Sequence, residues 1–145
     1  RKGEIEADLS GKNMGPSGAL LLAWDLKNGH VSASMTKMHD LSTSLGTEGG
    51  QALRDAAPPQ LQTFCGFEEG QTEADLSDIG LGSGDAVLLA WELTTGFVSS
   101  SMNSLNLAGN KLGVKIENGR YVADITGIKA IADAISVSSS MNSLK

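Results

Sequence analysis

The sequence contains a duplicated stretch that decides how the rest of the chain is interpreted. Residues Glu73–Met102 read EADLSDIGLGSGDAVLLAWELTTGFVSSSM, and residues Glu6–Met35 read EADLSGKNMGPSGALLLAWDLKNGHVSASM. The two stretches align without a gap, and EADLS, ALLLAW and VSASM of the first return as EADLS, AVLLAW and VSSSM in the second. A match of this length indicates that the chain is built from copies of one structural unit.

Each copy begins with a pattern typical of a strand and ends with a pattern typical of a helix. Ile5–Leu9 alternates apolar and polar residues, which predicts a half-buried strand. A glycine-rich turn follows, and Ser17 is a suitable N-cap for a helix that ends near Asn28-Gly29. The later units predict strands at Met38–Leu41 and Thr72–Leu76, a turn at Leu45–Gly50, and helices at Gln51–Ala57, Gly84–Thr95 and Gly127–Ser136.

The fourth unit has the plainest head motif and an insertion. Its head reads Leu105-x-Leu107-x-x-Asn110-x-Leu112-Gly113, and the insertion is Val114–Ala123. Within the insertion, VKIE and RYVA flank Asn118-Gly119, a residue pair that favours a two-residue β-turn. The insertion therefore predicts a protruding β-hairpin near Asn118-Gly119.

With its head motif and a strand–turn–helix order, the unit resembles a leucine-rich repeat, and unit four is similar to the ribonuclease-inhibitor-like subtype. The resemblance implies an α/β solenoid with parallel strands on a concave face and helices on a convex face. It implies one array over residues 1–145, with units at about 1–34, 35–66, 67–101 and 102–140 and a fifth starting at 141–145. The implied core contains Leu9, Met14, Leu22, Ala23, Leu26, Leu76, Leu81, Leu89, Ala90, Leu93, Leu107 and Leu112.

The composition excludes several classes of partner. Hydrophobic residues make up 40% and charged residues 19%, which is typical of a globular domain. The net charge of −6 argues against nucleic acid and against an anionic membrane surface. The longest apolar run, Ala19–Trp24, is too short to span a bilayer, so no transmembrane segment is predicted. A single cysteine, Cys65, indicates a reducing, intracellular compartment, either cytoplasm or organelle.

One glycine-rich stretch has the context of a nucleotide-binding loop. Gly80–Asp85 follows a predicted strand and opens a predicted helix, as a dinucleotide fingerprint does. Its sixth position is Asp85, whose charge would repel a pyrophosphate, and Asn13–Gly18 occupies the same place in unit one. A turn of the repeating unit explains both stretches, and no cofactor is predicted.

The chain lacks the residue spacings that metal binding or catalysis needs. His30 and His39 lie on different predicted elements, and Cys65 has no close potential zinc ligand beside it. No Gly-x-Ser-x-Gly motif occurs, and the serine clusters recur because the unit recurs. No metal site and no catalytic residue is predicted, and the chain is interpreted as a protein that is not an enzyme.

Two surfaces are candidates for binding a protein partner. On the concave face, the outward strand positions carry Glu6, Asp8, Glu73, Asp75 and Asn106. This face is acidic over two units, so it would suit a basic partner segment. The alternative is a sheet face that water alone contacts.

The second candidate surface is the convex face. At about 100° per residue, Trp24 lies well off the core stripe of its helix, near Leu20 and Leu21. Val87, Leu88 and Trp91 repeat this arrangement in unit three. Each tryptophan could cover the flank of a neighbouring helix. Alternatively, this face docks against another protein, since exposed tryptophan is a typical interface anchor.

The predicted function is therefore a non-catalytic protein–protein interaction scaffold, or an accessory subunit of a larger assembly that covers the open ends of the array. The alternative, drawn from the resemblance, is a regulator of an enzyme, either ribonuclease-inhibitor-like or GTPase-activating. A GTPase activator usually supplies an arginine, and Arg120 on the predicted hairpin is one candidate.

Overall fold

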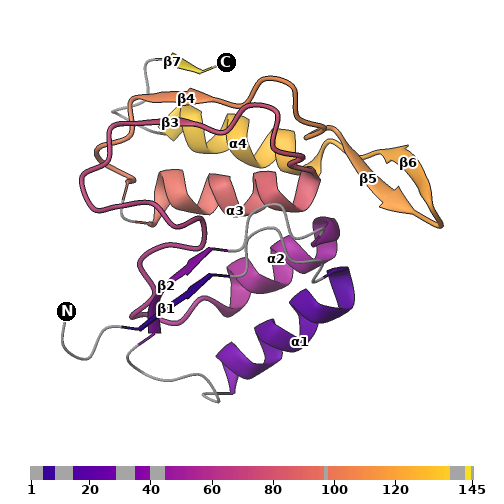
Figure 1. Cartoon of the computed structure of the whole chain (residues 1–145), viewed down its shortest axis with the longest axis horizontal. Helices are drawn as coiled ribbons and strands as arrows, with labels where there is room; N and C mark the ends of the chain where they lie inside the picture. The colour runs from indigo at the N-terminus through magenta and orange to yellow at the C-terminus, as the bar shows by residue number, and fades with distance from the viewer. Residues whose placement is uncertain are drawn as a thin grey trace.

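A computed structural model describes residues 5–8, 15–28, 35–39, 45–96, 98–137 and 143–144 of the chain (Figure 1). The helices are α1 (Gly15–Lys27), α2 (Gly46–Ala56), α3 (Ser83–Thr94) and α4 (Thr126–Val137). The strands are β1 (Ile5–Asp8), β2 (Met35–His39), β3 (Glu73–Asp75), β4 (Ser104–Asn106), β5 (Val114–Glu117), β6 (Arg120–Ala123) and β7 (Ser143–Leu144).

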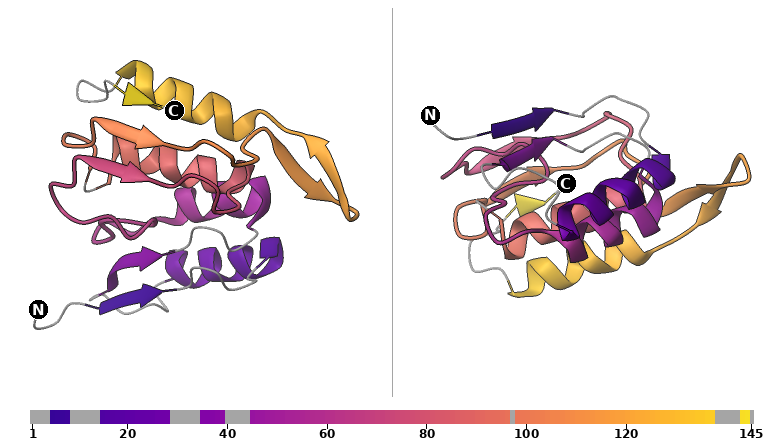
Figure 2. Two further views of the ribbon diagram at one scale, coloured as in Figure 1. Left: turned by 45° about the horizontal axis from the view of Figure 1, so that its top comes forward. Right: turned by 90° about the horizontal axis from the view of Figure 1, so that it is seen from below.

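The strands in the described part of the chain form three separate sheets. β1 pairs in parallel with β2, and β4 lies between β3 and β7 in a second parallel sheet. β5 and β6 form an antiparallel pair that projects from the body of the molecule (Figure 2). The chain is therefore a small mixed α/β domain.

The predicted leucine-rich-repeat solenoid is wrong. A solenoid of this kind requires one continuous parallel sheet with a strand from every unit, whereas the described parallel strands fall into two short sheets. The break lies between β2 and β3, because Lys37 of β2 forms an isolated bridge with Thr63 instead of pairing with β3. The hydrogen bonds Met38 N to Thr63 O (2.8 Å) and Gln62 N to Thr36 O (2.7 Å) occupy this edge of β2.

The predicted hairpin is confirmed. Asn118 and Gly119 both have positive φ, 52° and 76°, as a type I′ turn requires of its two central residues. Asparagine and glycine tolerate this left-handed region better than other residues do. At the hairpin base, the hydroxyl of Thr47 donates to Asp124 Oδ2 at 2.6 Å, which ties α2 to the chain that leaves β6.

The four helices lie side by side in chain order, α1 against α2, α2 against α3 and α3 against α4 (Figures 1 and 2). Glycines allow α2 and α3 to approach closely at their first turns. A Cβ atom on Gly84 would collide with the carbonyl oxygen of Gly46, and one on Gly50 would collide with that of Gly84. The prediction of a turn at Leu45–Gly50 is therefore wrong, because these glycines begin a helix whose backbone contacts α3.

Most of the predicted core is confirmed. Ala23, Leu26, Leu81, Leu89, Ala90, Leu93 and Leu107 are buried. Leu22, Leu76 and Leu112 are half-buried and pack against the buried clusters. Leu9 and Met14 lie outside the described residues. Among the helices that the structure describes, none is both long and apolar enough to cross a membrane.

Candidate functional site

The duplicated sequence gives two helices with the same apolar residues in different surroundings. Leu20, Leu21 and Trp24 of α1 correspond to Val87, Leu88 and Trp91 of α3 when Glu6 is aligned with Glu73. In α1 these side chains are 46%, 64% and 53% exposed, in that order. In α3 the first two are 0% exposed and Trp91 is half-buried. The two sets of side chains differ in exposure because their helices lie at different positions in the molecule, not because their residue types differ.

On α3, the packing of α2 explains the burial. Leu88 belongs to the same buried cluster as Leu53 of α2, and Trp91 packs against that cluster. The ring of Phe64 meets Trp91 edge to face, with centroids 5.1 Å apart and planes at 67°. Such aromatic pairs add to the stabilisation that area burial provides. Trp91 thus covers the flank of a neighbouring helix, as one sequence interpretation proposed.

A buried carboxylate fixes the segment that carries Phe64. Glu92 is fully buried, and its Oε1 accepts hydrogen bonds from Thr63 Oγ1 (2.6 Å), Phe64 N (2.6 Å) and Cys65 N (2.9 Å). Burial raises the pKa of the Glu92 carboxyl, while the hydrogen bonds from Thr63 and from the Cys65 and Phe64 backbone oppose that rise. This contact holds residues 63–65 against α3 and keeps the Phe64 ring on Trp91.

The side of α1 that faces away from α2 has no equivalent covering within the described part of the chain. Ala19, Ala23 and Leu26 are buried and belong to the cluster shared with α2. At about 100° per residue, Leu21 and Trp24 lie on the opposite side of the helix. No described helix or strand other than α2 packs extensively on α1. We call Leu20, Leu21 and Trp24 the outer face of α1.

Helix α4, at the other end of the row, differs from α1 in the residues that it presents to solvent. α4 packs on α3 through Ile131 and Ala134, which are buried. Lys129, Asp133 and Ser136 lie on the opposite side of α4 and are exposed. α4 also exposes Ile128 (44%) and Val137 (74%), so its outward residues are mixed polar and apolar, whereas the outer face of α1 consists of two leucines and a tryptophan.

The structure divides the predicted convex-face residues into two groups. Leu21 and Trp24 lie together on the outer face of α1, whereas Leu88 and Trp91 lie between α2 and α3, so they do not contribute to an outward surface. Leu20 joins the surface from the same helix. The helical periodicity of the sequence also predicts Leu20 near Trp24, off the stripe that faces α2.

The residues of the predicted acidic surface belong to two different sheets. Glu73 and Asp75 are exposed on β3, and Asp75 lies in register with Asn106 of β4. Glu6 and Asp8 belong to β1, in a different sheet, and their side chains lie outside the described part of the structure. The break after β2 separates the two acidic pairs.

Asp75 and Asn106 also have local structural roles. Asp75 Oδ1 accepts hydrogen bonds from the backbone and hydroxyl of Ser77, at 3.0 and 2.6 Å. Asn106 Oδ1 accepts from the backbone of Ala108 at 3.1 Å. Side chains of this kind stabilise turns by bonding to the backbone two residues on. The recurrence of polar residues at this position therefore follows from turn formation.

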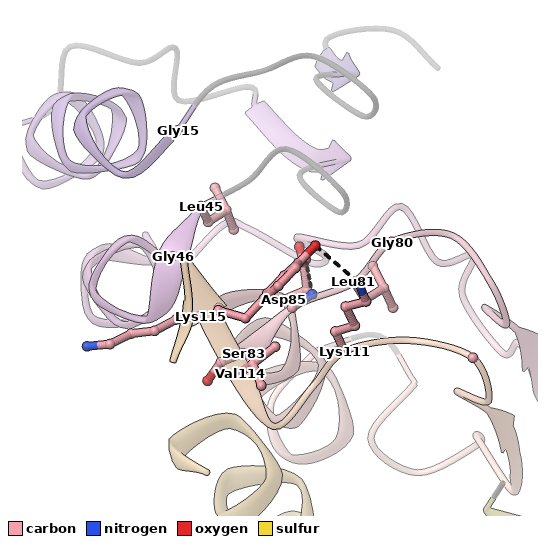
Figure 3. Close-up of a pocket in the computed structure, with 14 residues that line it drawn as sticks. Gly15, Leu45, Gly46, Gly80, Leu81, Ser83, Asp85, Lys111, Val114 and Lys115 are labelled. Atoms are coloured by element: carbon pink, nitrogen blue, oxygen red, sulfur yellow. Dashed lines mark hydrogen bonds between the residues drawn. The ribbon is translucent and has the colours of Figure 1, made fainter. Parts of the chain in front are cut away.

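A cavity of about 470 Å³ lies where the starts of α2 and α3 meet the base of the hairpin, and Figure 3 shows residues that line it. The glycine-rich stretch 80–85 forms one wall, and Asp85 Oδ2 accepts a hydrogen bond from Gly82 N at 2.9 Å, which caps α3. Lys111 lies 4.2 Å from the centroid of the Tyr121 ring, and Lys115 is paired with Glu117 at 3.6 Å. Both cations are engaged on the hairpin side, and the Asp85 carboxylate would repel a phosphate.

No group of three or more histidine, cysteine, aspartate or glutamate side chains that could hold a metal ion occurs among the described residues. Comparison of the sequence with models of protein families gives no match. Comparison with curated proteins gives no significant match.

Proposed function

We propose that this chain is a non-catalytic protein-interaction module, acting as an accessory subunit of a larger assembly, and that it contacts its protein partner through the outer face of α1. The observation that carries the proposal is the contrast between two copies of one helix. Leu21 and Trp24 are 64% and 53% exposed on α1, whereas the equivalent Leu88 is fully buried and Trp91 half-buried against α2.

The free energy of burying apolar side chains supports the outer face of α1 as a contact surface. Three large apolar side chains on adjacent turns form a patch, and tryptophan is prominent among residues that dominate binding energy. At about 25 cal/mol per Å² of apolar surface, covering these side chains contributes on the order of a few kcal/mol. α4 exposes Lys129, Asp133 and Ser136 together with Ile128 and Val137, so the helix at the other end of the row carries no patch of leucine and tryptophan.

We place the interaction inside the cell, in a reducing compartment. The basis is the cysteine content of the sequence, since small secreted domains usually contain several cysteines and this sequence contains one, Cys65.

The test compares capture of cellular proteins by the tagged wild-type chain with capture by the double variant Leu21→Lys/Trp24→Lys. Ala132→Lys/Ser136→Lys is the matched control, since it adds the same two charges to exposed positions of α4. We expect the double variant to lose proteins that the wild type and the control retain, with the circular dichroism spectrum unchanged. Retention of every partner by a correctly folded double variant would exclude the outer face of α1.

A further inference from the structure

The surroundings of α3 specify what chemistry fits the outer face of α1. The stripe of α3 that faces α2 consists of Gly84, Leu88 and Trp91, spaced by four and three residues. The equivalent residues of α1 are Ser17, Leu21 and Trp24, and all three are exposed. Neither stripe contains a charged side chain, so an occupant of either one must be apolar along its line of contact.

Three features of the chain cover the α3 stripe from one end to the other. At the first turn, Gly46 and Gly50 of α2 allow backbone-to-backbone approach. In the middle, Leu53 is fully buried in the cluster that contains Leu88. At the far end, Phe64 places its ring edge on Trp91. The covering segment is thus a helix with small residues at its start, a leucine in its middle, and a loop that returns an aromatic ring.

We propose that the outer face of α1 binds a segment of this same chemistry, supplied by the protein partner: a helix that begins with small residues, continues with an aliphatic residue opposite Leu21, and is followed by an aromatic ring that packs on Trp24. This inference rests on the proposed function and specifies its partner. Ser17 stands where α3 has Gly84, so the partner helix lies farther from α1 at this end than α2 lies from α3.

The duplication makes a direct experiment possible. A copy of residues 35–72 is placed immediately before Glu6, so that EADLS follows the copy as it follows Thr72 in the natural chain. Trp91→Phe in both the extended and the unextended chain leaves Trp24 as the only tryptophan. We expect the acrylamide quenching constant of Trp24 to fall by about two-fold in the extended chain, because a covalently linked segment is present at millimolar effective concentration.

The extended chain with Leu21→Lys is the matched control, and its Trp24 should be quenched as strongly as in the unextended chain. A folded extended chain whose Trp24 is quenched no less than that of the unextended chain overturns the proposal. If the extended chain does not fold, a synthetic peptide of residues 45–67 is titrated into the unextended chain. Protection of Trp24 then supports the proposal, and no protection up to about 1 mM peptide overturns it.

Other occupants give different results. If a second copy of this chain covers the outer face, light scattering on the unextended chain shows a dimer that Leu21→Lys dissociates, and the assignment to a partner segment is overturned. If Leu21→Lys/Trp24→Lys abolishes partner capture while the extension leaves Trp24 unprotected, the proposed function stands and the inference about the partner's chemistry falls. If the extension protects Trp24 but the variants keep every partner, the proposed function falls.

Discussion

At the scale of single residues, Glu92 carries a carboxyl group buried between α3 and residues 63–65. Burial raises its pKa above the ordinary value of 4.5. The stability that it contributes is therefore fully present below pH 4.5 and is lost as the pH rises through the raised pKa. We expect Glu92→Gln to remove this loss, so that the variant gains stability relative to the wild type as the pH rises above 4.5.

The measurement is the urea midpoint of both proteins from about pH 4.5 to pH 8. Glu48→Gln, at an exposed position of α2, is the control and should follow the wild-type curve. Parallel curves for the wild type and Glu92→Gln would show that the carboxyl of Glu92 does not change its ionisation in this range.

The pKa of Asp124 is shifted in the opposite direction from that of Glu92. Hydrogen bonds from Thr126 and Thr47 lower its pKa, so its contribution to stability is present above pH 3.8 and is lost as the pH falls through the lowered value. Thr47→Val removes the 2.6 Å bond to Asp124 and should lower the free energy of unfolding by about 1 kcal/mol near neutral pH. The difference in the free energy of unfolding between the wild type and Thr47→Val should become smaller in acid, because Asp124 becomes protonated there. Denaturation at about pH 7 and pH 3 checks this, and a deficit that grows in acid would contradict it.

At the scale of the helices, Gly84 determines how closely α2 and α3 pack. In an exposed helix, alanine in place of glycine stabilises by about 1 kcal/mol. Here the added Cβ would collide with the backbone of Gly46, and relieving such overpacking costs about 1–3 kcal/mol. We expect Gly84→Ala to lower the urea midpoint. A raised midpoint would mean that the first turns of α2 and α3 are not in backbone contact.

The duplicated helices provide a matched pair of substitutions. Leu21→Lys places a charge on an exposed side of α1 and should change stability by no more than about 0.5 kcal/mol. Leu88→Lys places the same charge in the core between α2 and α3, at a cost of about 3 kcal/mol or more. Chemical denaturation of both variants gives the comparison. Equal losses would contradict the different burial of the two helices.

At the scale of the whole molecule, the sequence predicts the local features well. The hairpin follows from Asn118-Gly119, because the pair supplies the positive φ values that its turn requires. The core residues of α1 and α3, such as Ala23, Leu26, Leu89 and Leu93, follow from helical periodicity. Each of these features depends on residues that are close in the sequence, so a local pattern suffices to predict it.

The continuity of the sheet does not depend on a local pattern, and its prediction is wrong. It depends on whether β2 pairs with β3 or with the segment around Thr63, and the contacts that hold this segment come from Glu92, far along the chain. The same holds for the candidate site. Trp24 and Trp91 have nearly the same sequence around them, and only the position of α2 makes one exposed and the other half-buried.

The contrast between α1 and α3, two copies of one helix of which α1 exposes its leucine and tryptophan and α3 packs them against α2, is the basis of the proposed function. The most direct test places the photocrosslinking residue benzoylphenylalanine at position 21 or at position 129 of the full chain in living cells. Leu21 lies on the outer face of α1, and Lys129 lies on the exposed polar side of α4. Light should give a discrete protein adduct at position 21 and none at position 129. No adduct at position 21, or the same adducts at both positions, would contradict the assignment of α1 as the interaction surface.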